Sequence, residues 1–101
     1  MVIFLHICYH SSMTLQQLKY VVAVADARNI TEASRRVFVS QPSLTAALQE
    51  LESEMGITIF SRSNKGVTVT NEGDEFLSYA RSFMKALMLY RLILSGLRRT
   101  S

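Results

Sequence analysis

Between Gln41 and Gln49 the chain carries small polar side chains with almost no charge. On a helix they fall opposite an apolar stripe with three- and four-residue steps, formed by Leu44, Leu48, Leu51 and Met55. The outward side is formed by Ser43, Thr45, Ala46 and Gln49. Glutamine can pair with adenine through two hydrogen bonds, and hydroxyl groups reach base edges or phosphates. Such a face suits a helix that lies in a DNA major groove, which is about 12 Å wide.

Basic side chains that could contact phosphate lie on both sides of this segment. Arg35 and Arg36 precede it, and Arg62 and Lys65 follow it. The overall charge of +3 is weak evidence for such contacts because of where the charges lie. Residues 13–80 hold six Lys and Arg against eight Asp and Glu, a net of −2, and residues 81–101 hold five Lys and Arg with no acid, a net of +5. Only a local arrangement with the four cations facing phosphate would favour DNA binding.

The sequence offers little for catalysis or for a bound metal. Both histidines, His6 and His10, lie close to Cys8, and no second pair of Cys or His exists to complete a four-ligand zinc site. No nucleophile with a base is recognisable, and no glycine-rich phosphate loop follows a strand. The single cysteine excludes a disulfide within the chain and favours a reducing cytoplasm. We therefore expect a cytoplasmic protein that is not an enzyme and holds no metal or cofactor.

Two short helices joined by a tight turn would position the polar face. The first is expected to begin at Thr31, whose hydroxyl can accept hydrogen bonds from the free N–H groups of the helix start. The second is expected to begin near Ser40, with Pro42 in its first turn, where a missing N–H costs little. An earlier helix from Thr14 to about Ala27 has apolar residues at helical spacing and is expected to pack behind the pair. Together they form a three-helix core.

The apolar period changes from helical to alternating over residues 56–69, which predicts a β-hairpin. Two isoleucines are expected to lie opposite two valines, namely Ile57, Ile59, Val67 and Val69. Residues 61–66 would form the polar connection. In it, Asn64-Lys65-Gly66 suits a tight turn, and Gly66 can adopt a positive φ without a steric penalty.

A long final helix is expected from Thr70, which is a good N-cap. Acidic residues follow it and suit the positive end of the helix dipole, namely Glu72, Asp74 and Glu75. The helix carries an apolar stripe suited to pairing with another helix, formed by Phe76, Leu77, Ala80, Phe83, Leu87 and Leu94.

Ordered motifs over residues 13 to about 80 resemble the N-terminal DNA-binding domain of LysR-type transcriptional regulators. The matching segments are Leu15–Val24, Thr31–Ser34, Val39–Leu44, Leu48–Glu52, Gly56–Arg62 and Val69–Gly73. The resemblance implies a mainly α-helical fold, a winged helix-turn-helix with a three-helix core and a small β-hairpin wing, followed by a C-terminal linker or dimerisation helix. It also implies sequence-specific binding of double-stranded DNA by a dimer that regulates transcription.

We expect DNA contacts from the recognition helix, the wing and the arginines before them. These residues are Gln41, Pro42, Ser43, Thr45, Ala46, Gln49, Arg62, Lys65, Arg35 and Arg36. Arg62 matches an arginine that contacts the minor groove or phosphate in the family, whereas a solvated turn is the alternative for both wing cations. Many family members carry a basic or larger polar side chain where this chain has Ala46, so we expect only an apolar contact there. Thr31 and Ser34 are expected to cap the helix and lie on its surface.

Three segments are expected along the chain: a leader at residues 1–12 without defined structure, the DNA-binding domain at 13–70, and the linker or dimerisation helix at 71–101. The family usually starts at the residue matching Met13 and continues into a large effector-binding domain, which is not recognisable here, so no small-molecule effector site is expected.

The basic, apolar tail after Arg81 has three interpretations: a dimer helix with extra apolar surface, a truncated or frameshifted end, or an amphipathic helix on a membrane surface. We do not expect a membrane partner. The alternative function is that of a truncated fragment that forms mixed dimers with full-length regulators.

Overall fold

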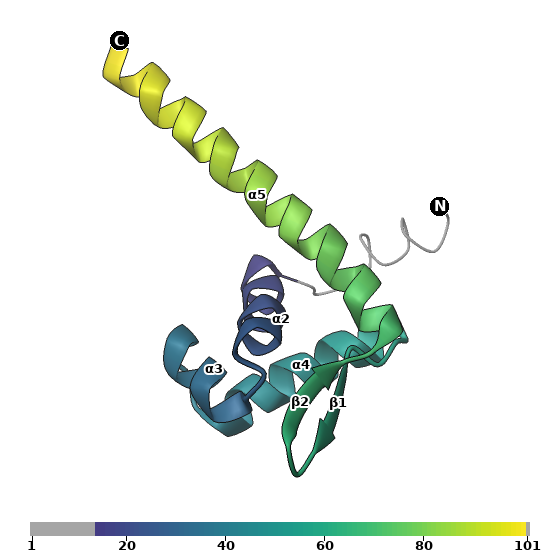
Figure 1. Ribbon diagram of the computed structural model, residues 1–101. Helices are drawn as coiled ribbons and strands as arrows, with labels where there is room; N and C mark the ends of the chain where they lie inside the picture. The colour runs from purple at the N-terminus through teal and green to yellow at the C-terminus, as the bar shows by residue number, and fades with distance from the viewer. Residues whose placement is uncertain (1–13, 101) are drawn as a thin grey trace.

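The computed structural model describes residues 14–100, with side chains as far as Leu97. The expected leader, with His6, Cys8 and His10, lies outside the described residues. The elements in chain order are α2 (Leu15–Ala27), α3 (Ile30–Val37), α4 (Gln41–Met55), β1 (Phe60–Ser63), β2 (Gly66–Val69) and α5 (Asn71–Thr100). Three short helices and the hairpin form a body from which the long α5 projects (Figure 1). This confirms the mainly helical winged helix-turn-helix.

The core lies between α2, α3, α4 and the base of the hairpin. Its largest fully buried side chains come from α2, α4 and the segment before β1, and are Val21, Val24, Leu44, Leu48, Leu51 and Ile59. Thr14 caps α2, since its Oγ1 accepts from the N–H of Gln17 at 3.2 Å while the Gln17 side chain accepts from the N–H of Thr14 at 2.9 Å. Burial of each of the six aliphatic core side chains named above stabilises the fold by about 1.5–3 kcal/mol.

Helix α3 begins at Ile30 and not at Thr31, so this boundary in the sequence analysis was wrong. The cap is Asn29, whose Oδ1 accepts from the N–H of Glu32 at 2.9 Å. The expectation for Ser34 was also wrong, because Ser34 is buried and its hydroxyl donates to the Thr31 carbonyl at 2.7 Å. At the other end Phe38 takes a left-handed conformation, with φ 59°, and ends the helix before the turn.

The hairpin is shorter than the sequence predicts. Phe60 pairs with Val69 and Ser63 with Gly66, so only Asn64 and Lys65 connect the strands, and the expected pairing of Ile57 and Ile59 with the valines was wrong. The backbone N–H and carbonyl of Ile59 form hydrogen bonds outside the hairpin. Its N–H donates to Glu52 Oε2 at 2.7 Å, and its carbonyl accepts from the N–H of Thr70 at 3.0 Å.

Gly66 has a φ of 117°, which confirms the positive φ expected at this position of the turn. A Cβ at this position would lie 2.9 Å from the Arg28 carbonyl oxygen. That carbonyl accepts from the N–H of Val67 at 3.2 Å, which fixes the base of the wing to the end of α2.

Helix α5 starts at the cap that the sequence predicts. Thr70 Oγ1 accepts from the N–H of Gly73 at 2.9 Å and donates to the Thr58 carbonyl, so the helix start is also held to the segment before the hairpin. An ion pair between Arg81 Nη2 and Asp26 Oδ1, 2.7 Å long, joins α5 to α2 near the point where α5 leaves the body. Within the described residues, no helix is long and apolar enough to cross a membrane.

Candidate nucleic-acid interface

The recognition helix α4 begins at the N-cap Ser40, and its register is fixed by three buried leucines, Leu44, Leu48 and Leu51. Ser40 Oγ accepts from the N–H of Ser43 at 3.2 Å and donates to Ser43 Oγ at 2.9 Å. The same register turns a polar face outward. Its exposed members are Gln41, Pro42, Ser43, Ala46 and Gln49, and Thr45 is half-buried beside them.

The second half of α4 has a different character. Glu50, Glu52 and Glu54 follow Gln49, and phosphate would be repelled by these carboxylates. Glu52 is half-buried, and its Oε2 accepts from the N–H groups of both Ile59 and Phe60, at 2.7 and 3.2 Å. The face of α4 that can approach DNA therefore lies in its first half.

The wing carries two exposed cations. Arg62 pairs with Val67 across the hairpin, so its side chain starts on the hairpin face that turns toward the core, yet it lies near the tip and is exposed. Lys65 lies in the turn, where its N–H donates to Ser63 Oγ at 3.3 Å. Neither side chain forms an ion pair within the part of the chain that the structure describes. Both are available to phosphate.

The two arginines of α3 are arranged differently from the wing cations. Arg35 and Arg36 both pair with Glu32, at 3.5 and 3.4 Å. Arg36 lines a shallow hollow with Leu15 and Lys19 at the start of α2. The candidate DNA contacts on α4 therefore lie on one face of that helix, whereas Arg36 lies beside α2, away from the wing.

The sequence analysis gave no role to Arg28. This exposed cation ends α2 in a left-handed conformation, with φ 55°, and its carbonyl holds Val67 of the wing. It therefore lies where α2, α3 and the wing meet. The only sequence signal was a cation directly before the Asn29 cap, which by itself does not distinguish a surface arginine from a DNA contact.

The expected dimer stripe divides into two parts. Leu77 and Ala80 are buried in the protein's own core, so they offer no accessible surface to a second chain, and Phe76 packs against the same core. The projecting part carries Phe83, which is 54% exposed, and the half-buried Leu87 and Leu94.

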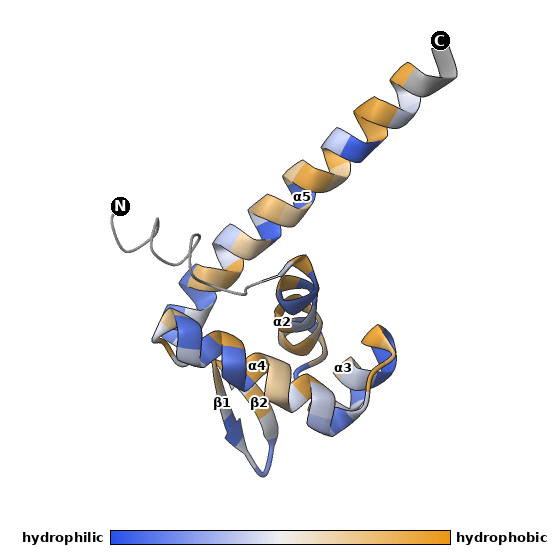
Figure 2. Cartoon of the chain, turned by 180° about the vertical axis from the view of Figure 1, so that it is seen from behind, coloured by the Kyte–Doolittle hydropathy of each residue, from blue (hydrophilic) through white to orange (hydrophobic). Residues whose placement is uncertain are grey.

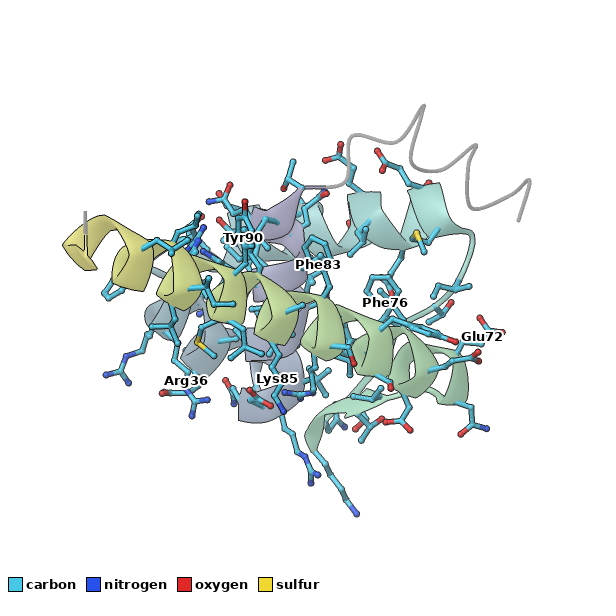
Figure 3. All side chains as sticks on the ribbon, turned by 90° about the horizontal axis from the view of Figure 1, so that it is seen from above. Arg36, Glu72, Phe76, Phe83, Lys85 and Tyr90 are labelled. Atoms are coloured by element: carbon cyan, nitrogen blue, oxygen red, sulfur yellow. The ribbon has the colours of Figure 1, made fainter. Side chains whose placement is uncertain are left out.

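Tyr90, 59% exposed, completes the projecting part of the stripe and was missed, although its spacing signals it. Phe83, Leu87, Tyr90 and Leu94 follow steps of four, three and four residues, the heptad pattern of a coiled-coil seam. Figure 3 shows Phe83 and Tyr90 on one side of α5 and Lys85 on the other.

A family model described as the bacterial regulatory helix-turn-helix protein, lysR family, matches residues 15–74. The chain belongs to the LysR family. The matched residues include the whole recognition helix and the wing. Among relatives in this family, the HTH-type transcriptional regulator TcbR of Pseudomonas sp. (strain P51) is 41% identical over 73 residues, which are 72% of this chain and 25% of that regulator. The chain thus spans about a quarter of the length of such relatives.

Two solved structures of DNA-binding domains in complex with DNA are similar to this LysR-family chain. The CbnR DNA-binding domain–DNA complex has a TM-score of 0.78 and 35% identity, covering 84% of this chain and 98% of that one. The complex of the BenM DNA-binding domain with benA site 1 DNA has a TM-score of 0.72 and 34% identity, covering 86% and 94%. The helix-turn-helix and wing described above are therefore those of a LysR-type DNA-binding domain.

Proposed function

We propose that this protein binds specific sites in double-stranded DNA as a dimer and thereby regulates transcription, without catalysis. The observation that carries the proposal is the outward face of α4, where Gln41, Ser43, Ala46 and Gln49 are exposed opposite a buried leucine stripe. Two exposed cations on the wing, Arg62 and Lys65, supply phosphate or minor-groove contacts. The similarity to DNA complexes of CbnR and BenM supports this use of the surface. Because the matching family model describes bacterial regulators, we propose that the protein acts on DNA in the cytoplasm.

We infer that the dimer forms through the heptad seam of α5. Figure 2 shows hydrophobic residues along the projecting part of α5. Several of its large apolar side chains are exposed, so a partner that covers them would stabilise the helix. The charges favour an antiparallel pair. The start of α5 carries the acidic residues Glu72, Asp74 and Glu75, and every charged residue of α5 beyond them is basic, so an antiparallel partner would bring opposite charges together.

Selection from a randomised duplex library tests the proposal. The full chain should enrich a two-fold symmetric motif, with half-sites one or more helical turns of about 10 base pairs apart, because a dimer presents two recognition helices. The double variant Gln41→Ala/Gln49→Ala should enrich a different or weaker motif. Recovery of sequences without any shared motif would contradict sequence-specific binding, and a motif with a single half-site would contradict the dimer.

A second function rests on the same seam. Because α5 exposes Phe83 and Tyr90, it could pair with the matching helix of a longer family member and sequester it in a mixed dimer. A gel shift with a full-length relative distinguishes the two functions. Sequestration predicts that added chain weakens the relative's shifted band, whereas independent DNA binding predicts a band of its own.

A further inference from the structure

A groove separates α2 from the projecting part of α5, on the side of α5 away from the heptad seam. It has a volume of about 410 Å³, and its floor is formed by apolar side chains of both helices, namely Leu15, Val22, Met84 and Met88. It borders the seam only at Leu87. The DNA-facing half of α4 and the wing do not contribute to it.

The rim of the groove is basic. Lys19 on α2 and Lys85 and Arg91 on α5 line it, and none of the three forms an ion pair among residues 14–97. A fourth cation, Arg81, is neutralised by Asp26. Among the residues that the structure describes, no acidic side chain lines the groove, and α5 carries none from residue 82 to residue 97. The groove is therefore complementary to a ligand that is both apolar and acidic.

The spacing of the cations indicates an elongated ligand. Lys85 to Arg91 spans six residues of α5, or about 9 Å, and Lys19 lies on the α2 side of the groove. A small anion would meet one or two of them, whereas a helix with acidic residues one turn apart would meet them all. Methionine side chains adapt to varied apolar partners, and Met84 and Met88 lie on the floor.

We propose that this groove binds an acidic amphipathic helix of another protein. A second copy that pairs through the heptad seam would cover another side of α5 and leave this groove open, since the groove borders the seam at Leu87. Figure 3 shows Lys85 on the side of α5 away from Phe83 and Tyr90, so the basic rim does not lie on the heptad seam. Such a partner would be held opposite the DNA-contacting surface, so it could bind the DNA-bound protein.

Fluorescence anisotropy with two labelled helical peptides tests this proposal. Both present leucine on one face, and the other face carries glutamate in one peptide and lysine in the other. The full chain should bind the glutamate peptide and not the lysine peptide. The double variant Lys85→Glu/Arg91→Glu should weaken glutamate-peptide binding at least about tenfold and create binding of the lysine peptide, because the charge pairs are reversed.

The matched control is Arg62→Glu/Lys65→Glu, which reverses two charges on the wing. It should lose DNA binding and keep the glutamate peptide. The circular dichroism spectrum of Lys85→Glu/Arg91→Glu should match that of the unaltered chain, which shows that this variant folds. Met88→Glu, at an exposed position, provides a second groove variant that should lose the glutamate peptide. Equal affinity for both peptides, or peptide binding insensitive to the groove variants, would overturn the proposal. Dissociation of a dimer by the groove variants, without peptide binding to the unaltered chain, would overturn it and assign the groove to a second copy.

Discussion

Arg62 illustrates how a single exposed cation can contribute to DNA affinity without reading sequence. Its side chain starts beside Val67 and ends near the wing tip, with no ion pair in the described residues. We expect Arg62→Ala to weaken binding to all duplexes and to lower the slope of log K against log salt by about 0.9, the value for one phosphate contact. Lys85→Ala, which removes an equal charge on the opposite side of the molecule, should leave the slope unchanged. Titrations at several salt concentrations measure both, and equal slopes for Arg62→Ala and the unaltered chain would remove Arg62 from the interface.

Gln41 belongs to the residues expected to read bases. It is exposed in the first turn of α4, and its amide can donate and accept at one base edge. Gln41→Ala should change the preference at one base pair by about 1–3 kcal/mol if the contact is bidentate. Ser53→Ala, also exposed on α4 but in its last turns, should change no preference. Competition between duplexes that differ at single positions measures this, and a uniform loss across all duplexes would instead indicate a phosphate contact.

At the scale of elements, the start of α5 depends on a close approach of backbone to backbone. A Cβ at Gly73 would lie 2.2 Å from the Ile59 carbonyl oxygen, whereas a Cβ at Gly96 would meet nothing within 4 Å. Gly73→Ala should therefore lower the free energy of unfolding by at least about 1–3 kcal/mol, because α5 must shift off the segment before β1. Gly96→Ala should raise the stability of the helix by about 0.5–1 kcal/mol. Urea unfolding followed by circular dichroism measures both, and a neutral Gly73→Ala would mean that α5 is not seated on Ile59.

At the scale of the whole molecule, the seam on α5 sets the oligomeric state. Leu94 lies on the seam with Phe83 and Tyr90, and Leu92, 63% exposed, lies on another side of the helix. Leu94→Glu should convert a dimer to a monomer at micromolar concentration and weaken DNA binding, because a charge in the seam is costly and two half-sites are no longer bound together. Leu92→Glu adds the same charge and should remain dimeric. Sedimentation measures the masses, and a Leu94→Glu dimer would exclude this seam.

The sequence by itself determined the features that depend on neighbouring residues. Three helix starts rest on hydrogen bonds between residues three apart, from the caps Thr14, Ser40 and Thr70, so the residue types were sufficient to predict them. The polar face of α4 follows from helical periodicity in the same way. The start of α3 was missed by one residue because Asn29 and Thr31 can both cap a helix.

Only the tertiary structure decided the features that depend on contacts between distant residues. Ile59 belongs to an alternating pattern that is typical of a strand. Its N–H donates to Glu52 and its carbonyl accepts from the N–H of Thr70, so the strand pairing begins at Phe60. Leu77 belongs to an apolar stripe, yet the position of α5 against the body buries it in the core. The groove has the same origin, because α2 and α5 are separated by more than 40 residues and its basic rim exists only where the two helices lie side by side. The periodicity of apolar residues in the sequence indicates which side of a helix is apolar, whereas tertiary packing determines what covers that side.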